Sequence, residues 1–449
     1  MQPPDSVKGR RAVVTGMGFC LPGPDRRLCR TKEQFWDIIS NARICLGLDG
    51  RYYGQIFQSV ADFQQWFPEI SSRHAANYSR VHFYGLTAMQ EAANDAGFDW
   101  RAGDLSHAAV LTAKVSIESS VNSYLEGVEA DPATITPEDA RRLFVRLGIS
   151  SPPTDVANVQ AALLRTDGPT FNVACGCASS NVLLGIARNL IVSGEVDVAV
   201  VTGADWFDLA RADHFYELAA VAERVPERPR EGATPPRTAF RFDSQMRPYD
   251  ERANCYNMGE GAVTLVLESE EHALRRGAAI YGEILAQATA RSALPSAMAL
   301  DMYGSGIVSA AQRCVARRVP WDRIGYVNGG AEGDKLFNIV ESHAMRTLFG
   351  EHAQHPLVSS QEACFGHSGS PLGNIGAAAT LLMMQRQRIC PTAGCEQPDP
   401  ILPFDPVAGT TCRPHDFDYA LSLNYQVGGV ATALLLGRYD APSSPPRHP

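Results

Sequence analysis

The stretch GPTFNVACGCASSNVLLGIA, residues 168–187, decides how the fold of this chain is interpreted. A β-rich run ends at a sharp turn, and the apolar residues that follow at 3/4 spacing predict a helix that ends near Gly194. Cys177 therefore falls at the N-terminus of a predicted helix. The apolar positions that define this helix are Val182, Leu183, Ile186, Ala187 and Leu190.

A cysteine in this position is suited to act as a nucleophile. Free backbone N–H groups and the positive end of the helix dipole favour the thiolate, which is the species that attacks a carbonyl. The same N–H groups, including that of Cys177, can bind the oxyanion of an acyl-transfer intermediate. A buried structural thiol is the usual alternative for a cysteine, but the turn before the helix favours the nucleophile.

The segment resembles the nucleophile elbow of the β-ketoacyl-acyl carrier protein synthases of the type I/II kind, within the thiolase-fold superfamily. Alignment through GPT and ASS places the family cysteine on Cys177 and not on Cys175. Six further blocks agree in order and spacing: AVVTGMG (12–18), VDVAVVTGAD (196–205), RPYDERANCYNMGEGA (247–262), GYVNGGAEGDKLFNIVESHAMRTLFGEH (325–352), VSSQEACFGHSGSPLGNIGAAA (358–379) and NYQVGGVATALLLGR (424–438).

The resemblance implies an α/β, thiolase-like fold in which two pseudo-symmetric α/β/α halves form a five-layered α-β-α-β-α architecture. Residues 1–255 would be the half that carries the nucleophile, and residues 256–440 the half that carries His367. The sequence pattern agrees, because strand and helix signals alternate in residues 10–205 and again from about 260 to 440. We expect a solvated loop at 222–240 and a disordered tail at 441–449.

Composition narrows the class of protein. A chain of 449 residues that is 45% hydrophobic can bury a large core, and a net charge of -9 argues against a nucleic-acid partner. Without a secretory signal or a run of about 18 apolar residues, we expect a cytoplasmic protein with no membrane span. The eleven scattered cysteines are interpreted as reduced thiols. Metal, flavin and nucleotide motifs are missing, so no cofactor is expected.

The resemblance implies a catalytic set that this chain only partly keeps. The family pairs its cysteine with two histidines, supported by a lysine and a glutamate. His367, in FGHSG, matches the second histidine, but the first falls on Gly330. The lysine position holds Glu362, while its glutamate partner remains as Glu341.

Two carboxylates would then stand where the family has an ion pair. Like charges disfavour double ionisation, so one carboxyl would stay protonated or recruit an arginine. In that state Glu362 is a candidate base or acid, with Glu341 in support. The alternative is that Glu362 turns to solvent or pairs with another cation.

The C-terminal glycine-rich loop also departs from the family pattern. Tyr425 and Gln426 stand where the family places its gating aromatic, so substrate gating is expected to differ. The resemblance implies that the second oxyanion N–H belongs to Val427.

Three functions compete. The leading hypothesis is an acyltransferase that forms an acyl-Cys177 thioester and passes the acyl group to a carbon, oxygen or nitrogen nucleophile in fatty acid or polyketide-type secondary metabolism, without two-histidine malonyl decarboxylation. The second is a non-catalytic partner subunit resembling a chain-length factor. The third is an ordinary decarboxylating 3-oxoacyl synthase.

The resemblance further implies partners. The acyl group would arrive on the phosphopantetheine of an acyl carrier protein, and the chain would form a homodimer, or a heterodimer with another ketosynthase-like chain. Because carrier proteins are acidic, a basic patch would bind one. Arg141, Arg142 and Arg146 on one predicted helix are candidates, against the alternative of an ordinary solvated helix face.

Overall fold

The computed structural model describes residues 9–47, 51–116, 118–149, 155–208, 243–294, 301–352, 355–426 and 428–439. Every structural statement below concerns these residues. The predicted loop at 222–240 and the predicted tail at 441–449 lie outside them.

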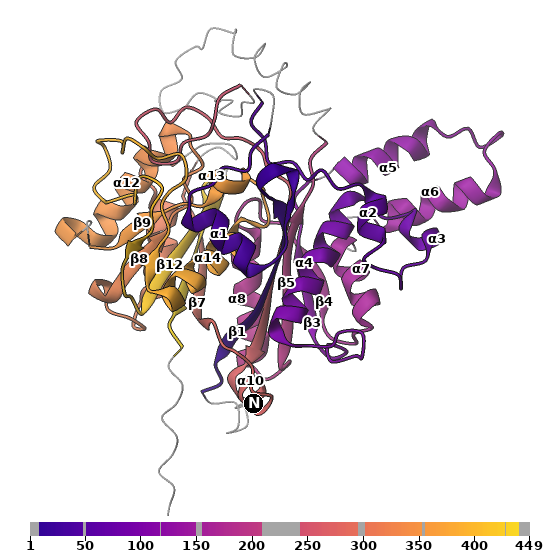
Figure 1. Cartoon of the computed structure of the whole chain (residues 1–449), viewed down its shortest axis with the longest axis horizontal. Coiled ribbons are helices and arrows are strands. Elements are labelled where there is room, and N and C mark those ends of the chain that lie inside the picture. The colour runs from indigo at the N-terminus through magenta and orange to yellow at the C-terminus, as the bar shows by residue number, and fades with distance from the viewer. Residues whose placement is uncertain are drawn as a thin grey trace, which may run out of the picture.

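One long mixed sheet runs through the protein, with the strand order β4-β3-β5-β6-β1-β7-β13-β12-β8-β9 and with β2 paired to β1 (Figure 1). A separate two-stranded ribbon joins β10 to β11. The strands are β1 (Ala12–Pro22), β2 (Leu28–Cys29), β3 (Ala109–Ala113), β4 (Thr170–Val173), β5 (Val198–Asp205), β6 (Gly261–Ser269), β7 (Gly282–Arg291), β8 (Ile324–Asn328), β9 (Leu357–Ser359), β10 (Arg388–Ile389), β11 (Arg413–Pro414), β12 (Tyr419–Gln426) and β13 (Val430–Gly437).

The sheet is built from two halves of the same topology. In the first, β4, β3 and β5 are parallel, and β6 and β1 continue antiparallel. In the second, β9, β8 and β12 are parallel, and β13 and β7 continue antiparallel. The halves meet where β1 pairs with β7 at Val13↔Glu283 and Val14↔Gly282. The predicted pseudo-symmetry is therefore confirmed, but β6 belongs to the first half, so the predicted boundary between residues 255 and 256 lies too early in the chain.

Helices connect these strands and cover both faces of each half. They are α1 (Lys32–Ser40), α2 (Val60–Gln64), α3 (Ser72–Ala75), α4 (Arg80–Ala96), α5 (Glu118–Glu129), α6 (Pro137–Ile149), α7 (Asp155–Leu164), α8 (Ser179–Val192), α10 (Glu270–Arg275), α11 (Ser305–Val315), α12 (Lys335–Phe349), α13 (Glu362–Phe365) and α14 (Leu372–Arg386), with short 3-10 turns at Pro24–Arg26, Trp321–Arg323 and Gly350–His352.

Three hydrophobic clusters lie between the layers and pack them against one another. The central cluster joins α8 and α14 to the inner face of both halves of the sheet. A second cluster packs α4 and α7 against the outer face of the first half, and a third packs α11 and α12 against that of the second. On β6, Val263 and Leu265 belong to the central cluster, whereas Ala262 and Val266 belong to the outer one. This alternation gives the predicted five layers.

The helices α5 and α6 form an antiparallel hairpin that stands away from the main body (Figure 1). On α6, Arg142 pairs with Glu138 at 2.8 Å and Arg146 pairs with Glu126 at 2.8 Å. Such exposed ion pairs are ordinary on a solvated helix face, and the carrier-protein patch of Arg141, Arg142 and Arg146 stays a prediction. The described helices include none with the length and apolar character needed to cross a membrane. All eleven cysteines are free thiols.

Candidate active site

The turn that carries Cys177 is held by its own hydrogen bonds. After β4 ends at Val173, Gly176 takes a positive φ of 54°, which favours glycine. The Ser179 hydroxyl accepts from the N–H of Cys175 at 2.8 Å and donates to the carbonyl of Gly176 at 2.6 Å. Helix α8 begins at Ser179, so Cys177 precedes its first turn as expected.

The structure brings Cys177 and His367 together. The sulfur of Cys177 lies 2.8 Å from Nε2 of His367. The backbone of His367 is fixed as well, because its N–H donates to Asn257 at 2.7 Å and its carbonyl accepts from Gly259 at 3.1 Å. The ring of Tyr256 packs edge-on against the imidazole, with centroids 5.4 Å apart. The sequence analysis expected these two side chains to lie together, and the structure places them so.

Two carboxylates share the far side of the imidazole. Nδ1 of His367 lies 2.9 Å from Oε2 of Glu362 and 3.2 Å from Oε2 of Glu332. The side chains of Glu362 and Glu332 are only 7% and 12% exposed. Glu362 is therefore buried beside His367, and the alternative that it turns to solvent is wrong, while its role as a base stays a prediction. The cation that it meets is His367.

Glu332 is a site residue that the sequence analysis missed. It lies just after β8, two residues beyond Gly330, where the family motif Y-V-N-A-H-G-T would have threonine. A carboxylate at a position where the motif has a small hydroxyl residue is the feature of the sequence that could have identified Glu332. The carboxylate expected beside Glu362 was Glu341, but the one that shares His367 with it is Glu332.

Burial sets the proton affinities of this cluster. Burial, with the nearby Glu362 and Asp334, raises the pKa of Glu332 to about 7 against the opposing effect of His367. Burial also raises the pKa of Glu362. For His367 burial alone would lower the pKa, but Cys177, Glu332 and Glu362 outweigh it and raise the pKa well above its ordinary value. One carboxyl can therefore hold a proton near neutral pH while the imidazole stays charged.

The same three residues could in principle hold a metal ion. Glu332, Glu362 and His367 offer donor atoms that all lie within 4.8 Å of one another. However, a single imidazole nitrogen at hydrogen-bond distance from two carboxylate oxygens has the geometry of a proton donor, and a protonated nitrogen is not a metal ligand. The arrangement suits proton handling better than metal binding.

Glu341 is held away from the imidazole by a different set of partners. One of its oxygens accepts from the N–H of Gly330 at 2.7 Å and from the hydroxyl of Tyr425 at 3.0 Å, and its other oxygen accepts from Tyr249. Burial raises the pKa of Glu341 to about 7. Glu341 therefore supports the backbone where the family has its first histidine, and it touches neither Cys177 nor His367 by a hydrogen bond found in the described residues.

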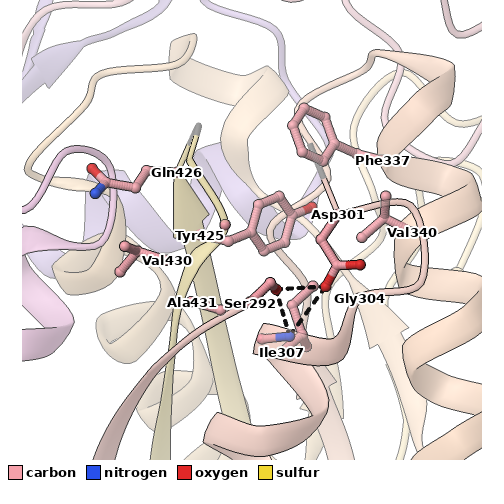
Figure 2. Close-up of a pocket in the computed structure, with 12 residues that line it drawn as sticks. Ser292, Asp301, Gly304, Ile307, Phe337, Val340, Tyr425, Gln426, Val430 and Ala431 are labelled. Atoms are coloured by element: carbon pink, nitrogen blue, oxygen red, sulfur yellow. Dashed lines mark hydrogen bonds between the residues drawn. The ribbon is translucent and has the colours of Figure 1, made fainter. Parts of the chain in front are cut away.

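The two predicted gating residues point in different directions. Figure 2 shows Tyr425 directed toward Phe337 and Gln426 directed to the opposite side. The rings of Tyr425 and Phe337 stack with centroids 5.0 Å apart, beside a narrow cavity of about 20 Å³. Gln426 lies against the elbow, since a Cβ on Gly176 would come within 1.8 Å of its Oε1. Gating by these residues stays a prediction, and Val427, the predicted oxyanion donor, lies outside the described residues.

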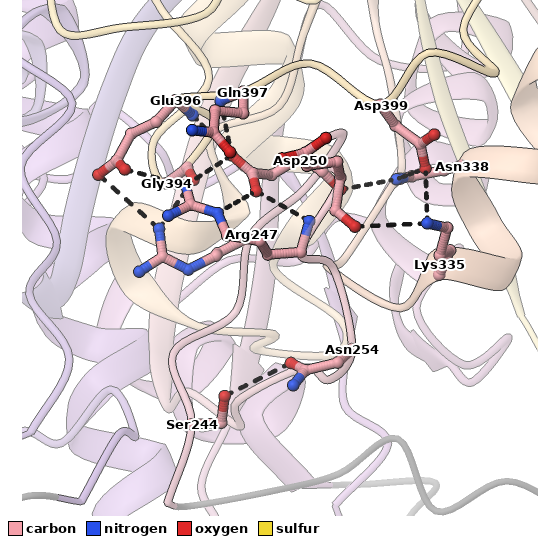
Figure 3. Close-up of polar contacts among 12 residues, drawn as sticks. Ser244, Arg247, Asp250, Asn254, Lys335, Asn338, Gly394, Glu396, Gln397 and Asp399 are labelled. Carbon is pink, nitrogen blue, oxygen red and sulfur yellow. Dashed lines mark hydrogen bonds and ion pairs between the residues drawn. The ribbon is translucent and has the colours of Figure 1, made fainter.

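A polar network anchors the loop that supports His367 (Figure 3). The buried Asp250 accepts from the Arg252 side chain and from the backbone N–H groups of Glu396 and Gln397, both at 2.8 Å. These hydrogen bonds outweigh burial and lower the pKa of Asp250. Asn338 accepts from the N–H of Tyr249 at 3.1 Å. The loop from Tyr249 to Gly259 is thereby tied to α12 and to the segment after β10.

A sharp turn that presents a cysteine before a helix, facing a buried histidine between two pseudo-symmetric halves, defines a protein of the thiolase-like fold. Profiles of the beta-ketoacyl synthase family match residues 9–273 (N-terminal domain) and 281–396 (C-terminal domain). The chain belongs to the beta-ketoacyl synthase family.

Individual relatives agree with this assignment. The chain is 30% identical to the granaticin polyketide putative beta-ketoacyl synthase 1 of Streptomyces violaceoruber, over 96% of this chain and 98% of that one. It is 25% identical to 3-oxoacyl-[acyl-carrier-protein] synthase 2 of a Synechocystis strain, over 97% and 100%. Among solved structures, the ishigamide ketosynthase/chain length factor has the same fold, with a TM-score of 0.76 at 24% identity over 96% of this chain and 100% of that one.

Proposed function

We propose that this protein is a ketosynthase-family acyltransferase that forms a thioester between an acyl group and Cys177 and then transfers the acyl group to a carbon, oxygen or nitrogen nucleophile. The observation that carries the proposal is the 2.8 Å approach of the Cys177 sulfur to Nε2 of His367, with Glu362 behind the imidazole at 2.9 Å. A nucleophile, a base and a group that orients the base form the arrangement that nucleophilic catalysis requires.

In the first half-reaction the thiolate of Cys177 attacks the carbonyl carbon of an acyl thioester. As the tetrahedral intermediate collapses, the carbon–sulfur bond of the donor breaks, and the departing thiolate takes the proton on Nε2 of His367. Glu362 accepts from Nδ1–H, so it fixes the tautomer and stabilises the charged imidazole before that transfer. The products are the acyl-Cys177 enzyme and a free thiol.

In the second half-reaction an acceptor attacks the acyl-Cys177 carbonyl. Neutral His367 now takes the acceptor's proton through Nε2, and the Cys177 thiolate leaves, which restores the starting state. Glu332, with a pKa of about 7 set mainly by burial, can release or take up a proton as the charge on the imidazole changes. No step requires a second histidine.

Malonyl decarboxylation is the step that the proposal leaves out. The family stabilises the enolate formed on loss of carbon dioxide with hydrogen bonds from two histidines, and here the first position is Gly330. Removing one such donor costs about 10² to 10³ in rate. The acylation step uses Cys177, His367 and Glu362 and does not involve the missing histidine, so this loss does not affect it.

The donor that we propose is an acyl group on the phosphopantetheine of a carrier protein. One relative is named as a 3-oxoacyl-[acyl-carrier-protein] synthase, and one structure of this fold is a ketosynthase in complex with its acyl carrier protein. Action within fatty acid or polyketide-type metabolism, a cytoplasmic location, assembly as a homodimer or heterodimer, and the absence of a further cofactor belong to the same proposal.

Intact-protein mass spectrometry tests the proposal. The protein is incubated with acetyl, butyryl and malonyl thioesters of pantetheine, and the expected result is a mass increase equal to one acyl group. The adduct should be lost in Cys177→Ala and kept in Cys412→Ala, which removes another partly buried thiol far along the chain. If no donor acylates Cys177, the proposal is overturned.

A second candidate is a non-catalytic partner subunit that resembles a chain-length factor. The replacement of the first histidine by Gly330 favours it, and the ishigamide protein with the same fold includes such a subunit by its name. Copurification with a second synthase-like chain, together with pathway activity that is unchanged in Cys177→Ala, would favour this candidate.

A further inference from the structure

Two cysteine thiols that the proposed function does not use lie in contact with each other. The sulfur of Cys412 is 3.8 Å from the sulfur of Cys390. Cys390 directly follows β10, and Cys412 directly precedes β11. The last pair of this antiparallel ribbon joins Ile389 to Arg413, so the next position along it sets the two cysteines opposite each other. The ribbon therefore holds two thiols side by side.

This placement suits a disulfide bond. Residues directly opposite each other in an antiparallel pair have Cα atoms about 4.5 to 5.5 Å apart, which lies within the range of about 4.4 to 6.8 Å found in disulfides. The sulfurs must close from 3.8 Å to a bond length of about 2.05 Å, and a rotation of the Cys412 side chain can supply this movement. Cys412 then gives up only a weak contact, in which its sulfur lies 3.3 Å from the carbonyl oxygen of Ser40.

The two thiols have different surroundings. Cys390 is fully buried, its backbone N–H donates to the sulfur of Met383 at 3.4 Å, and burial raises the pKa of its thiol. Cys412 is partly exposed. A hydrogen bond with Cys390 lowers the pKa of Cys412, and the charge of Arg388 adds to this shift, against the opposing effect of burial. Cys412 is therefore the thiol that ionises and meets an oxidant from the solvent, and Cys390 is in place to react with it next.

We propose that Cys412 and Cys390 form a reversible disulfide when the protein meets a peroxide, and that this pair is an oxidation-sensitive site separate from Cys177. The Cys412 thiolate attacks one oxygen of hydrogen peroxide and the O–O bond breaks, which gives the sulfenic acid of Cys412 and a hydroxide. This hydroxide takes up the proton that the Cys412 thiol had released to the solvent.

The second step uses the neighbouring thiol. The sulfur of Cys390 attacks the sulfur of Cys412, the S–O bond breaks, and the departing hydroxide leaves as water with the proton of Cys390. Two thiols and one peroxide thus give one disulfide and two waters, and the two sulfurs supply the two electrons that reduce the peroxide. A thiol reductant reverses the change by thiol–disulfide exchange.

The disulfide would close residues 390–412 into a loop that contributes to the support of the candidate active site. Within this loop the backbone N–H groups of Glu396 and Gln397 donate to Asp250, both at 2.8 Å (Figure 3). This network anchors the segment that holds the backbone of His367. Closing a loop with a disulfide stabilises the folded protein, chiefly by restricting the unfolded chain. Oxidation is therefore expected to make the protein more resistant to unfolding.

Peptide mapping of the full-length protein tests the inference. The reduced protein is treated with a small excess of hydrogen peroxide, the remaining thiols are alkylated, and the protein is digested. We expect a cross-linked product that joins the Cys390 and Cys412 peptides and is lighter by two hydrogen atoms than their sum. Dithiothreitol should separate them again. Cys177→Ala should form the same product, and the oxidised wild type should unfold at a higher urea concentration than the reduced protein.

The control variants test the pairing itself. Cys390→Ala and Cys412→Ala should each lose the cross-linked product and the shift in urea unfolding. Cys45→Ala should keep both, because it removes another partly buried thiol, the pKa of which burial raises to about 12.

The contrary outcomes are equally specific. Cys412 oxidised to sulfinic acid without a cross-link, or both thiols still reduced after Cys177 has been oxidised, would overturn the inference. If a variant does not fold, the peptide map of the wild type decides. The inference does not use the acylation of Cys177, so its failure leaves the proposed function standing, and failure of acylation leaves the disulfide standing.

Discussion

The ring of Tyr425 occupies the space into which a side chain at position 330 would extend. A Cβ built on Gly330 would lie 2.9 Å from Cε1 of Tyr425 and 3.0 Å from the carbonyl oxygen of Leu423. The same Glu341 oxygen accepts from the N–H of Gly330 and from the hydroxyl of Tyr425. The loss of the family's first histidine and the position of Tyr425 therefore belong to one arrangement.

This packing predicts a measurable coupling between the two positions. Gly330→Ala should lower the free energy of unfolding by about 1 to 3 kcal/mol, because a methyl group must enter a filled space. In a Tyr425→Ala background the same change should cost less by at least about 0.5 kcal/mol. A double-mutant cycle measured by urea unfolding checks this, and strictly additive effects would contradict it.

Malonyl decarboxylation provides the second prediction. Release of carbon dioxide from malonyl-pantetheine should be about 10² to 10³ slower than in a two-histidine relative assayed alongside. Gly330→His alone should not restore it, since the ring of Tyr425 blocks the new side chain. Labelled carbon dioxide is the measurement. A rate equal to that of the relative, and dependent on His367, would instead support an ordinary decarboxylating synthase.

Most of the fold could be predicted because its signals are local or repeated. The 3/4 spacing after Cys177 predicted a helix ending near Gly194, and α8 runs Ser179–Val192 with Gly194 in a left-handed conformation. Strand patterns such as VDVAVVTGAD correspond to β5. The pairing of β1 with β7, which joins the halves, could not be deduced from periodicity, because it depends on two segments about 270 residues apart.

The site was predictable only as far as its motifs extend. FGHSG identified His367, and the register of the preceding block, residues 325–352, identified the missing histidine at Gly330. What fills that space could not be predicted, since Tyr425 arrives from β12, far along the chain. The partnership of Glu362 with Glu332 was missed for a related reason. Glu332 lies on a loop and Glu362 begins α13, and their carboxylates become neighbours only through the imidazole between them.

Glu362 should control the pH dependence of acylation. Its charge helps to raise the pKa of His367, so Glu362→Gln should lower that pKa and move the alkaline fall of the acylation rate to lower pH by about one unit or more. The rate at its optimum should fall about 10²-fold, since the base loses its orienting partner. Rates measured by stopped-flow mass analysis from pH 5 to 9 give both values.

Glu332→Gln is the matched control for that experiment. Because burial already raises the pKa of Glu332 to about 7, its carboxyl is largely neutral at pH 6, and glutamine resembles the neutral form. The substitution should therefore cost less than Glu362→Gln at pH 6, and its effect should grow above pH 7. Equal losses in both variants at pH 6 would mean that the two carboxylates have the same role.

Stability should depend on pH through the buried carboxyl of Glu341. Burial raises its pKa from the ordinary 4.5 to about 7 in the folded protein. Between these values the folded state keeps a proton that the unfolded chain has released, so its contribution to the free energy of unfolding falls by up to about 1.4 kcal/mol per pH unit as pH rises. Below pH 4.5 the stabilising contribution of Glu341 is fully present, and above about pH 7 it has been lost.

Glu341→Gln should remove this contribution, because glutamine does not titrate. Relative to wild type, the variant should become progressively more stable from pH 5 to pH 7 and change little beyond pH 8. Urea unfolding at four pH values measures the difference. Glu138→Gln, at a side chain that is 76% exposed, should show no such trend. A difference between wild type and Glu341→Gln that stays constant over this range would show that Glu341 is ionised throughout, held charged by Tyr249, Tyr425 and the N–H of Gly330.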